Sequence, residues 1–169
     1  MAESFEIEPG VGMGPVRLGM RRSEVVMALG EPEREHPDWL GVGMELYWFG
    51  ASFSASLDGE GTVGALEMNR GGAVVAVFRG VDVLAAPASE AIDVFESSVG
   101  PGEYRENGYS FEFHNVRLWL WRQSLPGDSD IDDPQFRGGL HWDSVCISLD
   151  SYDAEVEAAA AARRKMGQR

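Results

Sequence analysis

The sequence predicts an α+β protein built from two tandem units, each a helix followed by an antiparallel meander of strands. The first observation is that one order of segments occurs twice. This order is a strand-like lead-in, a helix with a Ser-Glu start, a stop made by glycine and proline, and aromatic strands. The second copy begins about sixty-five residues after the first. The second observation is the alternation of apolar and polar residues in the strands, which is typical of antiparallel sheets with one solvated face.

The first unit begins with an acidic, glycine-containing lead-in at residues 2–14 and a strand-like segment at 16–20. A short helix is expected over 21–29, because its apolar residues fall on one side. Gly30 and Pro32 end this helix, since glycine adopts the left-handed cap and proline cannot continue a helix.

A meander of strands follows this helix. Serines alternate with apolar residues between Ser52 and Leu57, so one face of that strand is apolar and the other polar. The segment 58–61 reads Asp-Gly-Glu-Gly and is expected as a turn between strands. The expected strands lie at 46–49, 52–57, 63–68 and 74–78.

The second unit has a longer helix, expected over 88–99. Ile92, Phe95 and Val99 are spaced at i, i+3 and i+7 and form an apolar stripe. Ser89 is the expected N-terminal cap. Glycine and proline end this helix as they end the first one. The elements expected after it are a turn at 106–108 and strands at 109–114, 116–122 and 142–149.

The strands of both units are expected to join into one continuous, twisted sheet of roughly eight strands. The helices would cover one face of this sheet and leave the other face partly open. We divide the chain into a first unit at 1–80, a second at 81–150 and a C-terminal Ala/Glu-rich helix or tail at 151–169, all in one compact domain. Monomer and homodimer both stay open, with an edge strand at 74–78 or the Trp119 face as the dimer contact.

The net charge of −14 and the pI near 4.5 exclude two classes of partner. Nucleic acids and anionic membrane surfaces are bound by basic footprints, so we predict neither as a partner. A basic protein fits the charge, because opposite charge steers its approach. Solubility alone is the simpler explanation of the same charge.

Three observations predict a cytoplasmic location. The N-terminal residues lack the basic and apolar regions of a signal peptide. No stretch approaches the length of an apolar membrane span. Cys146 is the single cysteine, so no intrachain disulfide can form. We interpret Cys146 as a small strand residue and not as a nucleophile.

Histidines give no catalytic or metal-binding pattern. His36, His114 and His141 lie far apart in the sequence and share no metal or triad spacing. We expect all three at the surface or at sheet edges. Together with ungrouped glycines, this predicts a protein that is not an enzyme and has no cofactor and no metal.

An acidic loop lies late in the chain. Asp128, Asp130, Asp132 and Asp133 begin it like a calcium loop. The pattern then fails, because the sixth position lacks glycine and the twelfth position lacks glutamate. We interpret this loop as a contact for a basic partner.

Tryptophan and arginine are the residue types that most often anchor protein interfaces. Arg117, Trp119 and Trp121 alternate along the strand at 116–122 and share one of its faces. If this face is exposed, it forms an interaction patch; the alternative is that a helix, a loop or a second sheet covers it. The candidate partner-binding residues are Trp48, Arg117, Trp119, Trp121, Asp128, Asp130, Asp132, Asp133 and Trp142.

The segment 16–32, VRLGMRRSEVVMALGEP, resembles the helix segment of known helix-plus-meander modules. These include the BamE/SmpA-OmlA lipoprotein domain and each half of the beta-lactamase inhibitory proteins. The resemblance implies a tandem module with a curved antiparallel sheet that grips another protein. Small acidic proteins of this kind also occur among bacterial immunity proteins, which neutralise toxins.

Three functions follow from these observations. The favoured one is a non-enzymatic protein-binding module, an inhibitor or immunity protein that acts on a basic protein partner. The second is a small-ligand-binding domain with an aromatic pocket between helix and sheet, lined by Trp48, Phe111 or Trp119. The third is an enzyme, which needs a cleft that holds His114 or His141 within hydrogen-bond reach of a carboxylate.

Overall fold

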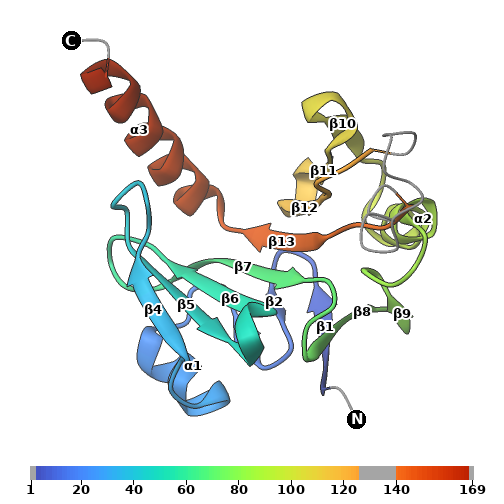
Figure 1. The fold of residues 1–169 in the computed structure, drawn as a ribbon, viewed down its shortest axis with the longest axis horizontal. Helices are drawn as coiled ribbons and strands as arrows, with labels where there is room; N and C mark the ends of the chain where they lie inside the picture. Colours follow the sequence, from blue (N-terminus) through green and yellow to red (C-terminus); the bar gives the residue numbers. More distant parts are fainter. Residues whose placement is uncertain (1–2, 126–139, 168–169) are drawn as a thin grey trace.

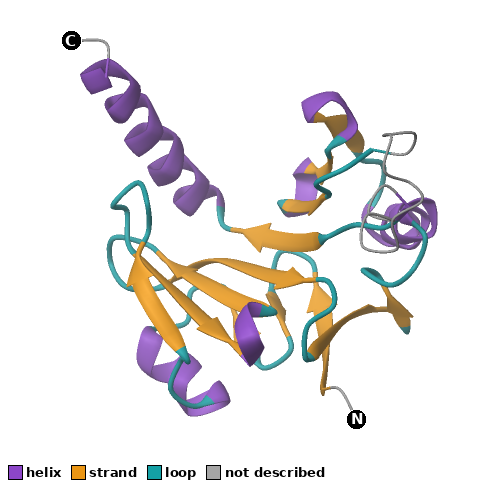
Figure 2. Ribbon diagram, in the orientation of Figure 1, coloured by secondary structure: helices purple, strands orange, loops and turns teal. Residues whose placement is uncertain are grey.

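The computed structural model describes residues 3–125 and 140–167 of the chain. Within these residues, three α-helices and two β-sheets form an α+β fold (Figures 1 and 2). The helices are α1 (Arg22–Leu29), α2 (Ala88–Val99) and α3 (Asp150–Gly167). The strands are β1 (Glu3–Glu8), β2 (Gly12–Met13), β3 (Val16–Arg17), β4 (Arg34–Pro37), β5 (Met44–Trp48), β6 (Phe53–Leu57), β7 (Val63–Asn69), β8 (Val74–Phe78), β9 (Val81–Asp82), β10 (Glu103–Arg105), β11 (Ser110–Phe113), β12 (Leu118–Trp121) and β13 (Ser144–Ser148).

The larger sheet has eight strands in the order β10-β11-β12-β13-β7-β6-β5-β4. All of its neighbouring strands are antiparallel. The strands that follow α1 and those that follow α2 meet where β7 pairs with β13. The smaller sheet has five strands in the order β3-β2-β1-β8-β9. The α+β class and the antiparallel pairing agree with the prediction from the sequence, whereas the smaller sheet was not expected.

One face of the larger sheet is apolar and buried. Residues directly opposite one another on adjacent strands share a face. One such row runs across the sheet through Phe111, Leu120, Val145, Met68 and Phe53. Each of these side chains is at most 4% exposed. We call the face that carries this row the inner face.

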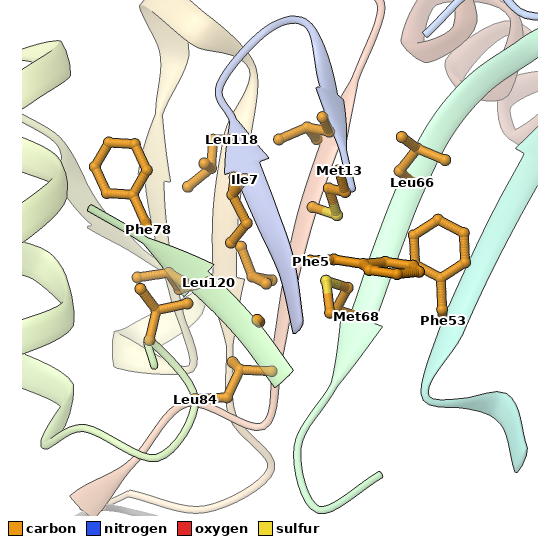
Figure 3. Close-up of a cluster of buried hydrophobic side chains, with 14 of the residues drawn as sticks. Phe5, Ile7, Met13, Phe53, Leu66, Met68, Phe78, Leu84, Leu118 and Leu120 are labelled. Carbon is orange, nitrogen blue, oxygen red and sulfur yellow. The ribbon is translucent and has the colours of Figure 1, made fainter. Parts of the chain in front are cut away.

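The smaller sheet and two helices cover the inner face. The ring of Phe5 from β1 meets that of Phe53 edge to face, with centroids 5.3 Å apart. Figure 3 shows Phe5 beside Phe53 and Met68. From α2, the ring of Phe95 packs 5.6 Å from that of Phe113 and stacks 4.4 Å from that of Phe78. These contacts join both sheets and α2 into one hydrophobic core.

The helix ends explain the helix boundaries. The Arg21 backbone N–H donates to the Glu24 carboxylate at 2.7 Å, which fixes the start of α1. Gly30 ends α1 with a φ of 83°, which favours glycine. The α2 helix spans the predicted residues, but its N-terminal cap is Pro87 and no side chain bonds there. The expected cap at Ser89 is therefore wrong, because Ser89 already lies inside the first turn.

Two strand predictions were also wrong. The expected lead-in at 2–14 contains β1 and β2, and β8 belongs to the smaller sheet and not to the first meander. β8 pairs in parallel with β1, with Ala76 opposite Phe5. Because β8 lies between β1 and β9, it is not the edge strand that was expected as a dimer contact. Both strands carry apolar side chains that must be buried, and their pairing places these side chains in the same core.

The α3 helix stands apart from the core. None of its described residues is buried, and it leaves the end of β13 and projects away from the sheets (Figure 1). The helix begins earlier than predicted, at Asp150, with acids in its first turn and Arg164 and Lys165 in its last. In the part of the chain that the structure describes, no helix combines the length and the apolar character needed to cross a bilayer.

Candidate functional site

The second face of the larger sheet is polar in its centre and carries two tryptophans. One row of opposed residues on this face runs through Glu103, Glu112, Trp119, Cys146 and Glu67. The next row contains Ser110, Trp121 and Ser144. We call this face the open face. The smaller sheet and α2 pack against the inner face, and the base of α3 approaches the open face.

The base of α3 docks at the edge of the open face. The Arg117 guanidinium donates to the Asp153 carboxylate, and its Nε lies 2.9 Å from the Asp150 carboxylate. The Ser148 hydroxyl donates to the same Asp153 carboxylate at 2.7 Å. A Cβ on Gly64 of β7 would overlap the ring of Tyr152, so only glycine lets this ring lie on the strand. These contacts fix the first turns of α3 beside β12.

A groove of about 570 Å³ lies between α3 and the strands β11 and β12. In Figure 1 α3 and the strands β10 to β12 stand on the same side of β13, which agrees with this position. Four carboxylates line the groove, together with one arginine, one histidine and two tryptophans. The lining residues used below are Glu106, Ser110, Glu112, His114, Arg117, Trp119, Trp121, Asp153 and Glu157.

The two tryptophans of the groove have no polar partner in the described part of the chain. Trp121 is 40% exposed and Trp119 is half-buried. By contrast, the indole N–H of Trp48 donates to the Gly30 carbonyl at 3.0 Å, and that of Trp142 donates to the Ala88 carbonyl at 3.1 Å. Tryptophan normally finds such a partner when it is covered. The indole N–H groups of Trp119 and Trp121 can therefore donate to a molecule that binds in the groove.

Glu112 is a groove carboxylate that makes only long contacts with its charged neighbours. Arg105 and His114 both make their short contacts with Glu103, each at 2.6 Å. The corresponding contacts with Glu112 are 4.0 and 3.6 Å, which is too long for a hydrogen bond. The hydrogen bond from His114, with help from Arg105, lowers the pKa of the Glu103 carboxyl. Glu112 thus keeps its acceptor capacity for a ligand.

Arg117 lies in the groove but does not face it as a strand residue. It ends a short 3-10 turn with a φ of 47°, and the strand begins only at Leu118. The Asp153 hydrogen bond raises the pKa of the Arg117 guanidinium. Its charge is therefore already matched by α3, so we assign it a structural role at the groove wall.

Ser110 provides a buried polar group without a partner. Its residue is 3% exposed, and its Oγ has no hydrogen bond in the described part of the structure. It lies directly opposite Trp121 and lines the groove. A buried hydroxyl without a partner is costly, so a group from a ligand would be stabilised here.

The centre of the open face contains a half-buried carboxylate and a buried thiol. Burial raises the pKa of the Glu67 carboxyl, and a hydrogen bond from the Ser144 hydroxyl opposes the shift. Burial also raises the pKa of the Cys146 thiol, and the Glu67 charge adds to the effect. A protonated, buried thiol is unreactive, in line with the interpretation of Cys146 as a strand residue.

The histidines divide between surface and groove. His36 Nδ1 lies 3.6 Å from the Glu45 carboxylate at the sheet edge. His141 Nδ1 lies 2.9 Å from the Ala86 carbonyl, beside a smaller cleft of about 300 Å³. His114 and Glu103 form the exposed pair at the mouth of the groove. In residues 3–125 and 140–167, no three such side chains are grouped to hold a metal ion.

The predicted partner-binding residues fall into three groups. Arg117, Trp119 and Trp121 meet in the groove. Trp48 and Trp142 are buried on the core side, and their indole N–H groups donate to the carbonyls of Gly30 and Ala88. The other four, Asp128, Asp130, Asp132 and Asp133, lie outside the described residues.

Sequence reasoning missed most of the groove lining, including the polar residues Ser110, Glu112, Asp153 and Glu157. Two signals pointed to them. Ser110 and Glu112 alternate with the apolar residues of their strand, so they share a face with Trp119 and Trp121 once the strands pair. Asp153 and Glu157 lie four residues apart on a helix, which places them on one side.

A scan of family models and searches of curated proteins and of solved structures found no match to this chain. The resemblance of the segment 16–32 to helix-plus-meander modules therefore stays a prediction.

Proposed function

We propose that this protein is a non-enzymatic protein-binding module that holds a basic protein on the open face of its larger sheet. The observation that carries the proposal is the pair Trp119 and Trp121, which have no polar partner among the described residues and lie in a groove that four carboxylates help to line. Aromatic anchors beside charged groups are typical of the energetic centre of an interface. The net charge of −14 supports a basic partner, because it speeds and orients encounter.

The finer parts of the proposal rest on other observations. We infer two related units, because α1 and α2 are each followed by four antiparallel strands. An inhibitor or immunity role is supported by the resemblance of the segment 16–32 alone. A cytoplasmic location is supported by the single cysteine, whose thiol is buried.

The test begins with capture from a lysate of the source organism, followed by purification of the captured protein and reconstitution of the pair. The variants are Trp119→Ala/Trp121→Ala and, as a matched control, Trp39→Ala. Trp39 is 69% exposed and lies outside the groove. We expect to capture a basic partner that binds the wild type and the Trp39→Ala control but not the groove variant. Its affinity for the wild type should fall as the salt concentration rises. A purified partner that binds the groove variant with unchanged affinity would overturn the proposal.

A small-ligand-binding domain is the second candidate, and the groove volume favours it. A volume of about 570 Å³ suits a small molecule. Trp119 lines the groove as that alternative requires, but Trp48 and Phe111 are buried in the core. The groove is not an enclosed cavity, which suits a protein segment better than a small molecule. Saturable binding of a metabolite that is lost in Trp119→Ala/Trp121→Ala, with no protein partner captured, would favour this candidate.

An enzyme is the third candidate, and its geometric condition is met by His114 and Glu103. A nucleophilic site also needs a hydroxyl or thiol that bonds to the histidine. In the described residues, no serine, threonine or cysteine bonds to His114. Arg105 also contacts both members of the pair, which holds them in an ion network. We therefore rank this candidate below the other two.

A further inference from the structure

We infer that the groove receives an arginine side chain of the partner, stacked on Trp121 or Trp119 and bonded to Glu112 and Ser110. This inference rests on the proposed function, since it names the chemistry by which the same groove recognises a basic protein. Three observations support it, and they concern the two tryptophan rings, the Glu112 carboxylate and the Ser110 hydroxyl.

The first observation concerns arginine on aromatic rings. Elsewhere in the molecule an arginine covers the ring of Trp142 at 4.7 Å, of Tyr47 at 4.7 Å and of Trp39 at 5.6 Å. In the described part of the chain, neither Trp119 nor Trp121 has such a cation. Tryptophan is the ring that attracts cations most strongly. Both rings can therefore take a guanidinium from another molecule.

The second observation is the position of Glu112. It lies directly opposite Trp119 on the neighbouring strand, so its carboxylate and the indole share one face. Its contacts with Arg105 and His114 are long, whereas Glu103 holds both groups closely. A guanidinium on the ring would find a carboxylate within reach, in the manner of charge-assisted hydrogen bonds.

The third observation is Ser110, which is buried opposite Trp121 with its Oγ unbonded in the described structure. An arginine N–H donates to this oxygen without displacing an existing bond. The two indole N–H groups can in turn donate to backbone carbonyls of the partner segment. An arginine on a peptide chain thus offers a partner to Glu112, to Ser110 and to both indole N–H groups.

Lysine satisfies this arrangement less well. Its ammonium is a compact, strongly hydrated charge, whereas the guanidinium is planar, stacks on aromatic rings and presents five donors in a fixed fork. Glu112 and Ser110 offer two acceptors beside an aromatic ring. This arrangement matches the forked guanidinium of arginine better than the compact ammonium of lysine. We therefore expect selectivity for arginine and not a general preference for positive charge.

The test titrates the full chain with three capped peptides, acetyl-Gly-Gly-X-Gly-Gly-amide, in which X is arginine, lysine or citrulline. Citrulline keeps the shape of arginine and removes its charge. The readout is the NMR signal of each indole N–H among the five tryptophans. We expect the arginine peptide to shift the signals of Trp119 and Trp121 and to leave that of Trp39 unchanged. The lysine peptide should bind about threefold and the citrulline peptide about tenfold more weakly.

Two variants assign the contacts. We expect Glu112→Gln to weaken the arginine peptide about fivefold and Ser110→Ala about threefold. The matched control is Glu90→Gln, which removes the same charge from α2, outside the groove, and should change the affinity less than about twofold. Equal affinity for arginine and citrulline, or an unchanged affinity in Glu112→Gln, would overturn the inference.

The outcomes also separate this inference from the proposed function. If the arginine peptide fails to bind while the purified partner still needs Trp119 and Trp121, the arginine assignment is wrong and the binding module stands. If the arginine peptide binds the groove while the purified partner ignores both tryptophans, the arginine site stands and the proposed function is wrong.

Discussion

Trp142 and Trp121 are close in the fold but lie in opposite surroundings. Trp142 is fully buried, its indole N–H is bonded to the Ala88 carbonyl and its ring is covered by Arg122. Trp121, at the end of β12, is 40% exposed on the open face and has neither kind of partner among the described residues. The same residue type therefore stabilises the fold on the core side and remains available for recognition on the open face.

The two faces of the larger sheet differ in the same way. Phenylalanine, leucine and methionine fill the inner face and lock it to the smaller sheet and the helices. Serines, carboxylates and two tryptophans occupy the open face. Substitutions on the inner face should therefore cost stability, and substitutions on the open face should cost binding.

The largest effect is expected for Trp142→Ala. Removing a fully buried tryptophan leaves a cavity and removes a buried hydrogen bond, so we expect a loss of about 3–5 kcal/mol in the free energy of unfolding. Urea denaturation followed by circular dichroism measures it. A loss below about 1 kcal/mol would show that Trp142 does not belong to the core.

A smaller effect is expected for Gly64→Ala at the base of α3. The new methyl group overlaps the Tyr152 ring, so either the ring or the start of α3 must move. We expect a loss of about 1–3 kcal/mol and faster proteolysis within α3. Gly59→Ala is the matched control, because its nearest atom is 3.6 Å away. Equal stability of the two variants would contradict the docking of α3 on β7.

The pH dependence of Glu67 tests the polar centre of the open face. Burial raises its folded pKa above the ordinary value, so the folded state binds a proton more tightly than the unfolded state. Wild-type stability should therefore fall as pH rises from about 4.5 through the raised pKa. Glu67→Gln removes the buried charge and should raise the free energy of unfolding at pH 7 by about 1 kcal/mol.

As the pH falls below 4.5 the carboxyl becomes mostly protonated in both states, so the gain from Glu67→Gln should largely disappear. Denaturation of both proteins at pH 4 and pH 7 measures the difference. A gain of the same size at both pH values would show that the effect is not electrostatic.

The smallest stability effect is expected on the groove tryptophans. Trp121→Ala removes a ring that is already partly in water, so the free energy of unfolding should fall by less than about 1 kcal/mol. The same urea denaturation measures it beside Trp142→Ala. A loss as large as that of Trp142→Ala would place Trp121 in the core and remove the contrast between the two faces.

The sequence predicted α2 well, because Ile92 and Phe95 repeat with the helical period and Gly100 follows the last turn. It did not predict the smaller sheet. Alternation in β1 and β8 indicates that each has a buried side, but it does not specify which strand is the neighbour. Their parallel pairing brings together residues about seventy positions apart, which no local pattern encodes.

For the groove, alternation correctly placed Trp119 and Trp121 on one face of their strand. It did not show that this face stays open while Trp142 is buried, because that depends on where the smaller sheet packs. The sequence pattern also did not predict the pair of Glu103 and His114. It arises from the pairing of β10 with β11 and from a short 3-10 turn, and neither leaves a motif.

The most direct measurement is a calorimetric titration of the purified partner into wild type and into the folded Trp119→Ala/Trp121→Ala variant at low and high salt. We predict about a hundredfold loss of affinity in the variant and weaker wild-type binding at high salt. An unchanged affinity in the folded variant would contradict the assignment of the open face as the binding surface.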